Sequence, residues 1–219
     1  LCAGALAVAA PATALTTVTT STADGAVAVH INDARRPGLD TGSIRNVANS
    51  RMEGFGNLFL HADGADAPRM NDQMVRGFGL TADAVGSFRS ARSVRFGDVL
   101  VTRKVDVGPD GTTSFFDTFT NTAADATTLD VSFGGSLGYG AAPSTAGTVT
   151  ASSSGDAVAD AADAWVVATT SGSYRPTGVV VGDGVAALGD QQNNPFEDAY
   201  QTSGSAANDI GFVRELEIA

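Results

Sequence analysis

Two residues of opposite charge, Arg103 and Asp117, stand at positions of alternating segments where an apolar side chain is expected. An arginine beside a carboxylate can bind a ligand in a cleft, or the two groups can neutralise each other inside a core. The choice between these roles depends on whether the surrounding elements bring the two side chains together and whether they expose them.

The segment between the two charges contains GPDGT (108–112), which predicts a three-residue hairpin loop. Pro109 presets a type I turn, Asp110 suits its second position, and Gly111 adopts the left-handed conformation that closes it. In the resulting register Arg103 faces Asp117, with Cβ atoms about 4.5–5.5 Å apart. We therefore expect a structural ion pair, with a role in a binding or catalytic cleft as the alternative.

Other polar residues give weaker signals. The histidines, His30 and His61, show no HxH or HExxH spacing, and the chain has no GxSxG segment, so we assign no catalytic residue. Asp156, Asp160 and Asp163 form the candidate calcium loop, although ordinary turns explain them too and no EF-hand pattern is present. No other cofactor is expected.

Three aromatic residues are candidates for ligand binding: Tyr139, Tyr174 and Trp165. Rings that line one groove could stack on a sugar, whereas a core or rim anchor is the alternative for Trp165. Glu215 and Glu217 alternate on the last predicted strand, and a solvated strand face explains them better than a glycosidase pair.

Alternating apolar residues predict about ten strands and little helix. The clearest cover residues 88–107, 112–121 and 127–133, and the others cover 25–33, 56–64, 72–81, 147–156, 163–170, 177–184 and 210–219. Two weak helix candidates, 155–163 and 194–201, could equally be loops. We expect an all-β fold, an antiparallel β-sandwich of the supersandwich kind.

Composition narrows the class of protein. The net charge is −11, and the 13 basic residues are scattered, which argues against a nucleic-acid partner. Twelve of these basic residues are arginine, a bias typical of GC-rich genomes. Hydrophobic residues make up 43% of the chain, enough for a packed core.

The first residues, LCAGALAVAAPATALTT, are typical of the apolar core and cleavage region of a secretory signal peptide. We assign residues 1–19 to a truncated signal peptide and residues 20–219 to a single β-sandwich domain. The apolar run is too short to span a membrane. The single cysteine, Cys2, lies inside this leader, so we expect a mature, secreted protein without disulfides.

The strand VTRKVDV, followed by FFDTFTN, LDVSFGGSLG and later SGD and DAW, resembles uncharacterised β-sandwich modules in secreted proteins of high-GC bacteria. It is also similar to strands of the mutarotase-type supersandwich. The resemblance implies secretion and a sandwich fold, and no reaction. We expect a non-catalytic accessory or interaction module whose partner is a polysaccharide or another extracellular protein. The alternative is a carbohydrate-binding module or part of a sandwich-type polysaccharide lyase or glycoside hydrolase.

Overall fold

The computed structural model describes most of the chain. The described residues are 17–22, 25–31, 41–46, 53–64, 68–137, 147–169, 176–180, 182, 185–189, 203–205 and 209–219. They contain strands and loops and no helix, and every strand pairing in them is antiparallel. The predicted all-β, sandwich-like class is therefore confirmed.

The strands are more numerous than the sequence pattern indicates, and most are shorter, although β11 extends past the predicted 127–133. They are β1 (Thr17–Thr22), β2 (Gly25–Ile31), β3 (Ile44–Asn46), β4 (Glu53–Phe55), β5 (Asn57–His61), β6 (Leu80–Ala84), β7 (Ser87–Ser90), β8 (Val94–Phe96), β9 (Val99–Val107), β10 (Thr113–Asn121), β11 (Thr127–Ser136), β12 (Thr148–Ser152), β13 (Trp165–Thr169), β14 (Thr177–Val180), β15 (Val185–Gly189) and β16 (Asp209–Ile218).

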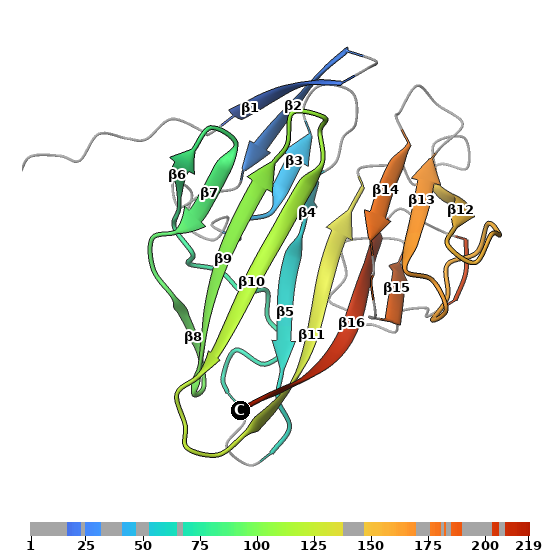
Figure 1. The fold of residues 1–219 in the computed structure, drawn as a ribbon. Coiled ribbons are helices and arrows are strands. Elements are labelled where there is room, and N and C mark those ends of the chain that lie inside the picture. Colours follow the sequence, from blue (N-terminus) through green and yellow to red (C-terminus); the bar gives the residue numbers. More distant parts are fainter. Residues whose placement is uncertain are drawn as a thin grey trace, which may run out of the picture.

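These strands form four sheets (Figure 1). The sheet β10-β9-β7-β6, with β8 also paired to β9, lies in front of the sheet β15-β16-β11-β5. The sheet β1-β2-β3-β4 continues the rear layer, because Gly56 alone separates β4 from β5. The sheet β12-β13-β14 flanks β15 and β16. One hydrophobic cluster contains buried residues from all four sheets, among them Val29, Val101, Leu129 and Val166.

The hairpin of β9 and β10 has the register that its loop predicts. Arg103 pairs with Asp117 and Val107 with Thr113. The Gly108 amide donates to the Thr112 carbonyl (2.7 Å), and Gly111 has a φ of 87°. Local turn chemistry thus positions the two charged residues opposite each other.

The expected strand 88–107 is divided into β7, β8 and β9. Both β7 and β8 pair with the same side of β9, β7 along Lys104–Asp106 and β8 along Val99–Val101. Between these two pairings, at Arg103, the side chain of Ser90 takes the place of a backbone hydrogen-bond partner. Its hydroxyl accepts from the Arg103 amide (2.6 Å) and donates to the Arg103 carbonyl (2.9 Å).

The expected strand 72–81 is also shorter, because residues 70–75 cover the edge of β5 instead. The amides of Asp72 and Val75 donate to the carbonyls of Leu60 and Leu58 (3.0 and 2.8 Å). Residues 155–163, a weak helix candidate, form a loop, and 194–201 lie outside the described residues. Of the assigned leader, residues 17–19 belong to β1. No helix in the described part of the chain is long and apolar enough to cross a membrane.

Candidate functional site

Arg103 lies at the centre of the buried face of β9. Its neighbours on that face, Val99, Val101, Val105 and Val107, are all buried, and Arg103 itself is 1% exposed. A buried guanidinium is stable only where its donors find acceptors and its charge finds a partner. The structure supplies both from elements distant in sequence.

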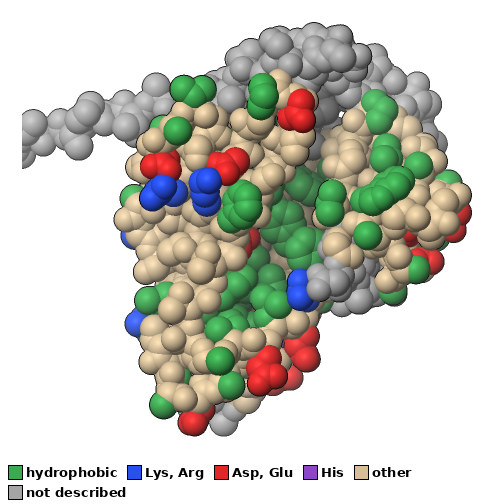
Figure 2. All heavy atoms as spheres, in the orientation of Figure 1, with side chains coloured by type: hydrophobic (Ala, Val, Ile, Leu, Met, Phe, Trp, Pro, Cys, Tyr) green, Lys and Arg blue, Asp and Glu red, His purple; other side chains and the backbone are tan. Residues whose placement is uncertain are grey.

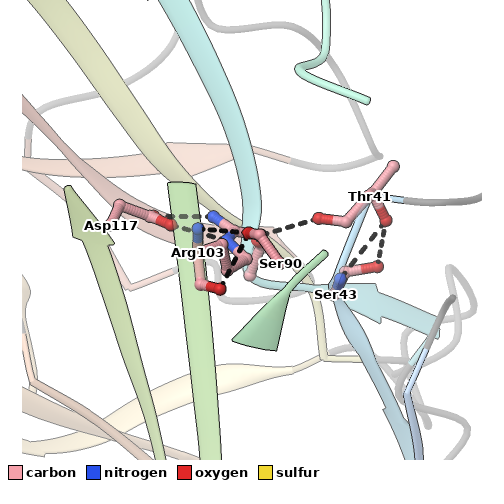
Figure 3. Close-up of polar contacts among 6 residues, drawn as sticks. Thr41, Ser43, Ser90, Arg103 and Asp117 are labelled. Atoms are coloured by element: carbon pink, nitrogen blue, oxygen red, sulfur yellow. Dashed lines mark hydrogen bonds and ion pairs between the residues drawn. The ribbon is translucent and has the colours of Figure 1, made fainter. Parts of the chain in front are cut away.

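The Asp117 carboxylate binds the guanidinium through two hydrogen bonds (Figure 3). Arg103 Nε donates to Asp117 Oδ1 (2.6 Å), and Nη2 donates to Oδ2 (2.7 Å). Arg103 Nη1 donates to the carbonyls of Thr41 (2.8 Å) and Gly56 (2.5 Å). The side chain of this one residue therefore links β9 and β10 to the rear layer.

Three aromatic rings surround the same guanidinium. Its Cζ atom lies 5.2 Å from the ring centre of Phe78, 5.4 Å from that of Phe115 and 5.8 Å from that of Phe133. These distances fit cation–π contacts, which strengthen when the cation is removed from water. The Arg103 side chain itself is fully covered from solvent.

Two glycines make room for this arrangement. A Cβ atom on Gly42 would lie 2.8 Å from Cδ of Arg103, and one on Gly56 would lie 2.4 Å from Cζ of Phe115. Both glycines have positive φ, 64° and 91°. Close approach and backbone conformation therefore both require glycine here.

Arg103 and Asp117 therefore form an internal structural contact. The Asp117 side chain is 11% exposed and that of Arg103 is fully covered, so the pair presents little surface to a ligand. The alternative of a catalytic or binding pair has no support in this geometry.

The three candidate calcium ligands hold their own loop together. Asp163 is buried, and its carboxylate accepts hydrogen bonds from the amides of Ser154 and Asp160 (both 3.0 Å). Burial raises the pKa of Asp163, but these donors outweigh it and hold the pKa at about 2. Asp156 accepts from the Val158 amide (2.9 Å), and Asp160 from the Ala162 amide (2.8 Å).

Calcium binding by these residues stays a prediction. Within the described residues, no three His, Cys, Asp or Glu side chains are grouped so as to hold a metal ion. The observed contacts of Asp156, Asp160 and Asp163 are those of turns and loop closure.

The predicted aromatic platform is described at one position. Trp165 begins β13 and is 42% exposed, beside Val180 of β14, which is 75% exposed. Tyr139 and Tyr174 lie outside the described residues, so their position relative to Trp165 stays a prediction. Glu215 and Glu217 are exposed on β16, as expected for a solvated face.

An apolar cleft lies between the front sheet and β16. Figure 2 shows hydrophobic side chains in a hollow over β5, β11 and β16, beside β10. Phe115 and Phe119 of β10, Phe133 of β11 and Leu216 and Ile218 of β16 are partly buried residues packed against the core. We call this hollow the β10–β16 cleft.

The cleft lies where the apolar side chains of the rear sheet change from buried to partly exposed. Leu60 of β5 and Leu129 of β11 are buried, whereas Leu216, paired to Leu129, is half-buried. Among the described strands the front sheet ends at β10, and Leu216 and Ile218 of β16 lie beyond it, partly exposed. The cleft closes at one end, where Asn121 Nδ2 donates to the Ile218 carbonyl (3.3 Å).

Sequence reasoning missed a second polar cluster. His61 Nδ1 lies 2.7 Å from Asp72 Oδ1, and His61 Nε2 lies 3.0 Å from Asp63 Oδ1. Hydrogen bonds to Asp63 and Asp72 raise the pKa of His61 above its ordinary value. Only Asp63 is close to His61 in sequence; Asp72 reaches it because residues 70–75 cover the edge of β5.

The fold and these sites define an all-β antiparallel protein with a buried ion pair and an open apolar cleft. No protein-family model, curated protein or solved structure matches this chain.

Proposed function

We propose that the protein is a secreted, non-catalytic interaction module that holds a partner protein in the β10–β16 cleft. The observation that carries this proposal is the partly exposed pair Leu216 and Ile218 of β16, which packs against the same core as the rings of Phe115, Phe119 and Phe133. Contiguous apolar hollows with polar rims are typical of interaction sites. The ion pair of Arg103 and Asp117 supports the same interpretation. Arg103 joins the two layers of sheet that form the walls of the cleft, because it also binds the carbonyls of Thr41 and Gly56.

A photo-crosslinking experiment tests this function. A photoreactive phenylalanine analogue would replace Leu216 in the cleft or, as a control, Val85 in the exposed turn between β6 and β7. Each protein would be irradiated with the secreted proteins of the producing organism. We expect a defined partner to be crosslinked from position 216 and not from position 85. Identical products from both positions, or none from position 216, would contradict the proposal.

Carbohydrate binding is a second candidate, favoured by the exposure of Trp165. Val167, on the same face of β13, pairs with Gly178 of β14, and nothing lies within 4 Å of a Cβ built on Gly178. The surface beside Trp165 is therefore open at Gly178, which leaves room for a sugar stacked on the ring.

Affinity electrophoresis in soluble polysaccharides tests this candidate. If it is right, a polysaccharide retards the protein and Trp165→Ala abolishes the retardation, while Phe116→Ala does not. Phe116 is a matched control because it is a similarly exposed ring, 52% against 42% for Trp165, on a different sheet. Unchanged retardation in Trp165→Ala would remove carbohydrate binding at this site.

A further inference from the structure

β10 is the edge strand of the front sheet. Its one partner among the described strands is β9, along its whole length from Thr113 to Asn121. The other side of β10 borders the β10–β16 cleft. An edge strand of this length carries a row of backbone groups able to pair with another strand.

The alternation of antiparallel hydrogen bonds shows which backbone groups point toward the cleft. The Arg103 amide and carbonyl both bond to Ser90, on the side of β9 away from β10. Its partner Asp117 therefore directs its own amide and carbonyl away from β9. The same holds for Phe115 and Phe119, two residues before and after it.

The β5 edge of the rear sheet, unlike the β10 edge, is covered by another segment of the chain. β5 is also an edge strand, but residues 70–75 bond to its free backbone, and Asn71 Nδ2 and Oδ1 bond to the carbonyl and amide of Ala62 (2.7 and 3.0 Å). Edges that are not meant to pair are usually covered in this way. No described segment covers β10 similarly.

Side chains on both faces of β10 suit an added strand. Phe115 and Phe119 face the cleft, where they would contact alternate residues of the incoming segment. On the outer face Phe116 is 52% exposed and flanked by Ser114 and Thr118, with no charged residue on that face of β10. An incoming strand would therefore meet apolar neighbours on each side, as in β-strand addition.

The charges near β10 indicate which kind of strand would bind there, a second copy of this protein or a basic segment of a partner. The exposed charged residues at the two ends of β10 are acidic: Asp110 in the hairpin loop and Asp125 beyond Asn121. Arg214, on the cleft-facing row of β16, already has an interaction of its own. A second copy would bring another net charge of −11, whereas a basic segment would be attracted.

We infer that β10 accepts an extended polypeptide segment of a partner as an additional strand, with alternate apolar residues in the cleft and basic residues flanking them. This inference rests on the proposed function and specifies the chemistry of the partner.

Amide hydrogen exchange by NMR tests it with a designed probe. The probe is a peptide of alternating Val and Thr with lysines at both ends, and its control has the central Val replaced by Pro, which removes a ladder donor. We expect the first peptide to slow exchange of the backbone amides of Phe115, Asp117 and Phe119, because these amides point away from β9 and toward the cleft. Ser114, Phe116 and Thr118 already bond to β9 and should not change. The proline peptide should have no effect.

A pair of variants localises the effect. Thr118→Lys places a positive charge on the edge strand near the lysine-flanked peptide and should weaken peptide binding roughly two- to fivefold through like-charge repulsion. Thr102→Lys is the matched control, because Thr102 pairs with Thr118 on the same exposed face, one strand further from the edge. Equal weakening by both variants would overturn the inference.

Three other outcomes would also overturn it: no slowing at Phe115, Asp117 and Phe119; equal slowing by the proline peptide; or slowing in the protein alone that rises with its concentration, which would identify a second copy as the occupant. If the partner still crosslinks from position 216 in any of these cases, strand addition is wrong and the interaction function stands. If no partner crosslinks either, both are wrong.

Discussion

At the scale of single residues, Arg103 is the largest fully buried side chain of the described residues. Four valines and this arginine form the buried face of β9, and a fifth valine would fit the same alternation, yet only the arginine must find acceptors for its donors. It finds them in Asp117 and in two backbone carbonyls. Its contribution is therefore one of specificity, because few packings of the two layers satisfy all of these groups together.

A double-mutant cycle tests this pair. Arg103→Met and Asp117→Leu should each lower the free energy of unfolding by about 3–5 kcal/mol, since each leaves a buried charge without its partner. The double variant should lose less than the sum of the two, and urea unfolding measures all three. A double variant whose loss equals the sum would show that the two side chains do not interact.

His61 gives a pH-dependent prediction. Hydrogen bonds to Asp63 and Asp72 raise its pKa in the folded protein. Protonated His61 therefore contributes stability that is present below its ordinary pKa of 6.5 and is lost as pH rises through the raised folded value. His61→Gln should reduce the free energy of unfolding at about pH 5 and much less at about pH 9. Urea unfolding at both pH values checks the difference, and a pH-independent effect would contradict it.

At the scale of elements, the loop between β12 and β13 is held by hydrogen bonds to its own side chains, with the buried carboxylate of Asp163 at its centre. Asp163 binds the amides of Ser154 and Asp160, and Ser153 Oγ accepts from the Ala164 amide (2.7 Å). The loop also pairs with residue 204 through the Ala159 amide and carbonyl (2.8 and 3.0 Å). This network takes the place of the weakly predicted helix.

Substitution of Asp163 tests the loop. Asp163→Ala should lower the free energy of unfolding by about 2–4 kcal/mol at neutral pH, because two amides lose their acceptor. The pKa of Asp163 is lowered from 3.8 to about 2, so its contribution is present above about pH 4 and is lost as pH falls through about 2. Thermal unfolding across this range should show the two proteins converging at low pH. Asp160→Ala, which removes a carboxylate from an exposed turn, is the control.

The wild type, Asp163→Ala and Asp160→Ala also test the prediction that this loop binds calcium. If Asp163 and its neighbours bind calcium, the ion should raise the unfolding midpoint of the wild type and of neither variant. A midpoint that calcium leaves unchanged would identify the three aspartates as loop-closing groups alone.

At the scale of the whole molecule, four sheets share one hydrophobic cluster. Buried residues of β13 and β14, such as Val166 and Val179, belong to the same cluster as Val101 of the front sheet. A shared core predicts cooperative unfolding of residues 20–219 as one domain.

The single tryptophan makes this prediction measurable. Trp165 lies in the small sheet of β12–β14, so its fluorescence reports that sheet, whereas far-ultraviolet circular dichroism reports all strands. The two signals should give coincident urea transitions. An earlier fluorescence transition would show that β12–β14 unfolds as a separate unit.

Local patterns by themselves determined the class of fold, the β9–β10 register and the pairing of Arg103 with Asp117. Each depends on residues close in sequence: alternation sets a strand, and a tight loop sets the register of the strands it joins. Asn121 is a similar case, because its side chain accepts from the Ala123 amide in the turn that follows β10.

Tertiary structure alone decided what surrounds these elements. The acceptors at Thr41 and Gly56 lie 62 and 47 residues from Arg103, and no spacing rule connects them. The division of 88–107 into three strands depends on which partners β9 finds. Among the described strands, the front sheet ends at β10 while the rear sheet continues past β11 to β16 and β15, and this difference leaves the cleft. Contacts between sheets depend on how whole faces pack, and this packing is set by the combined shape of many side chains.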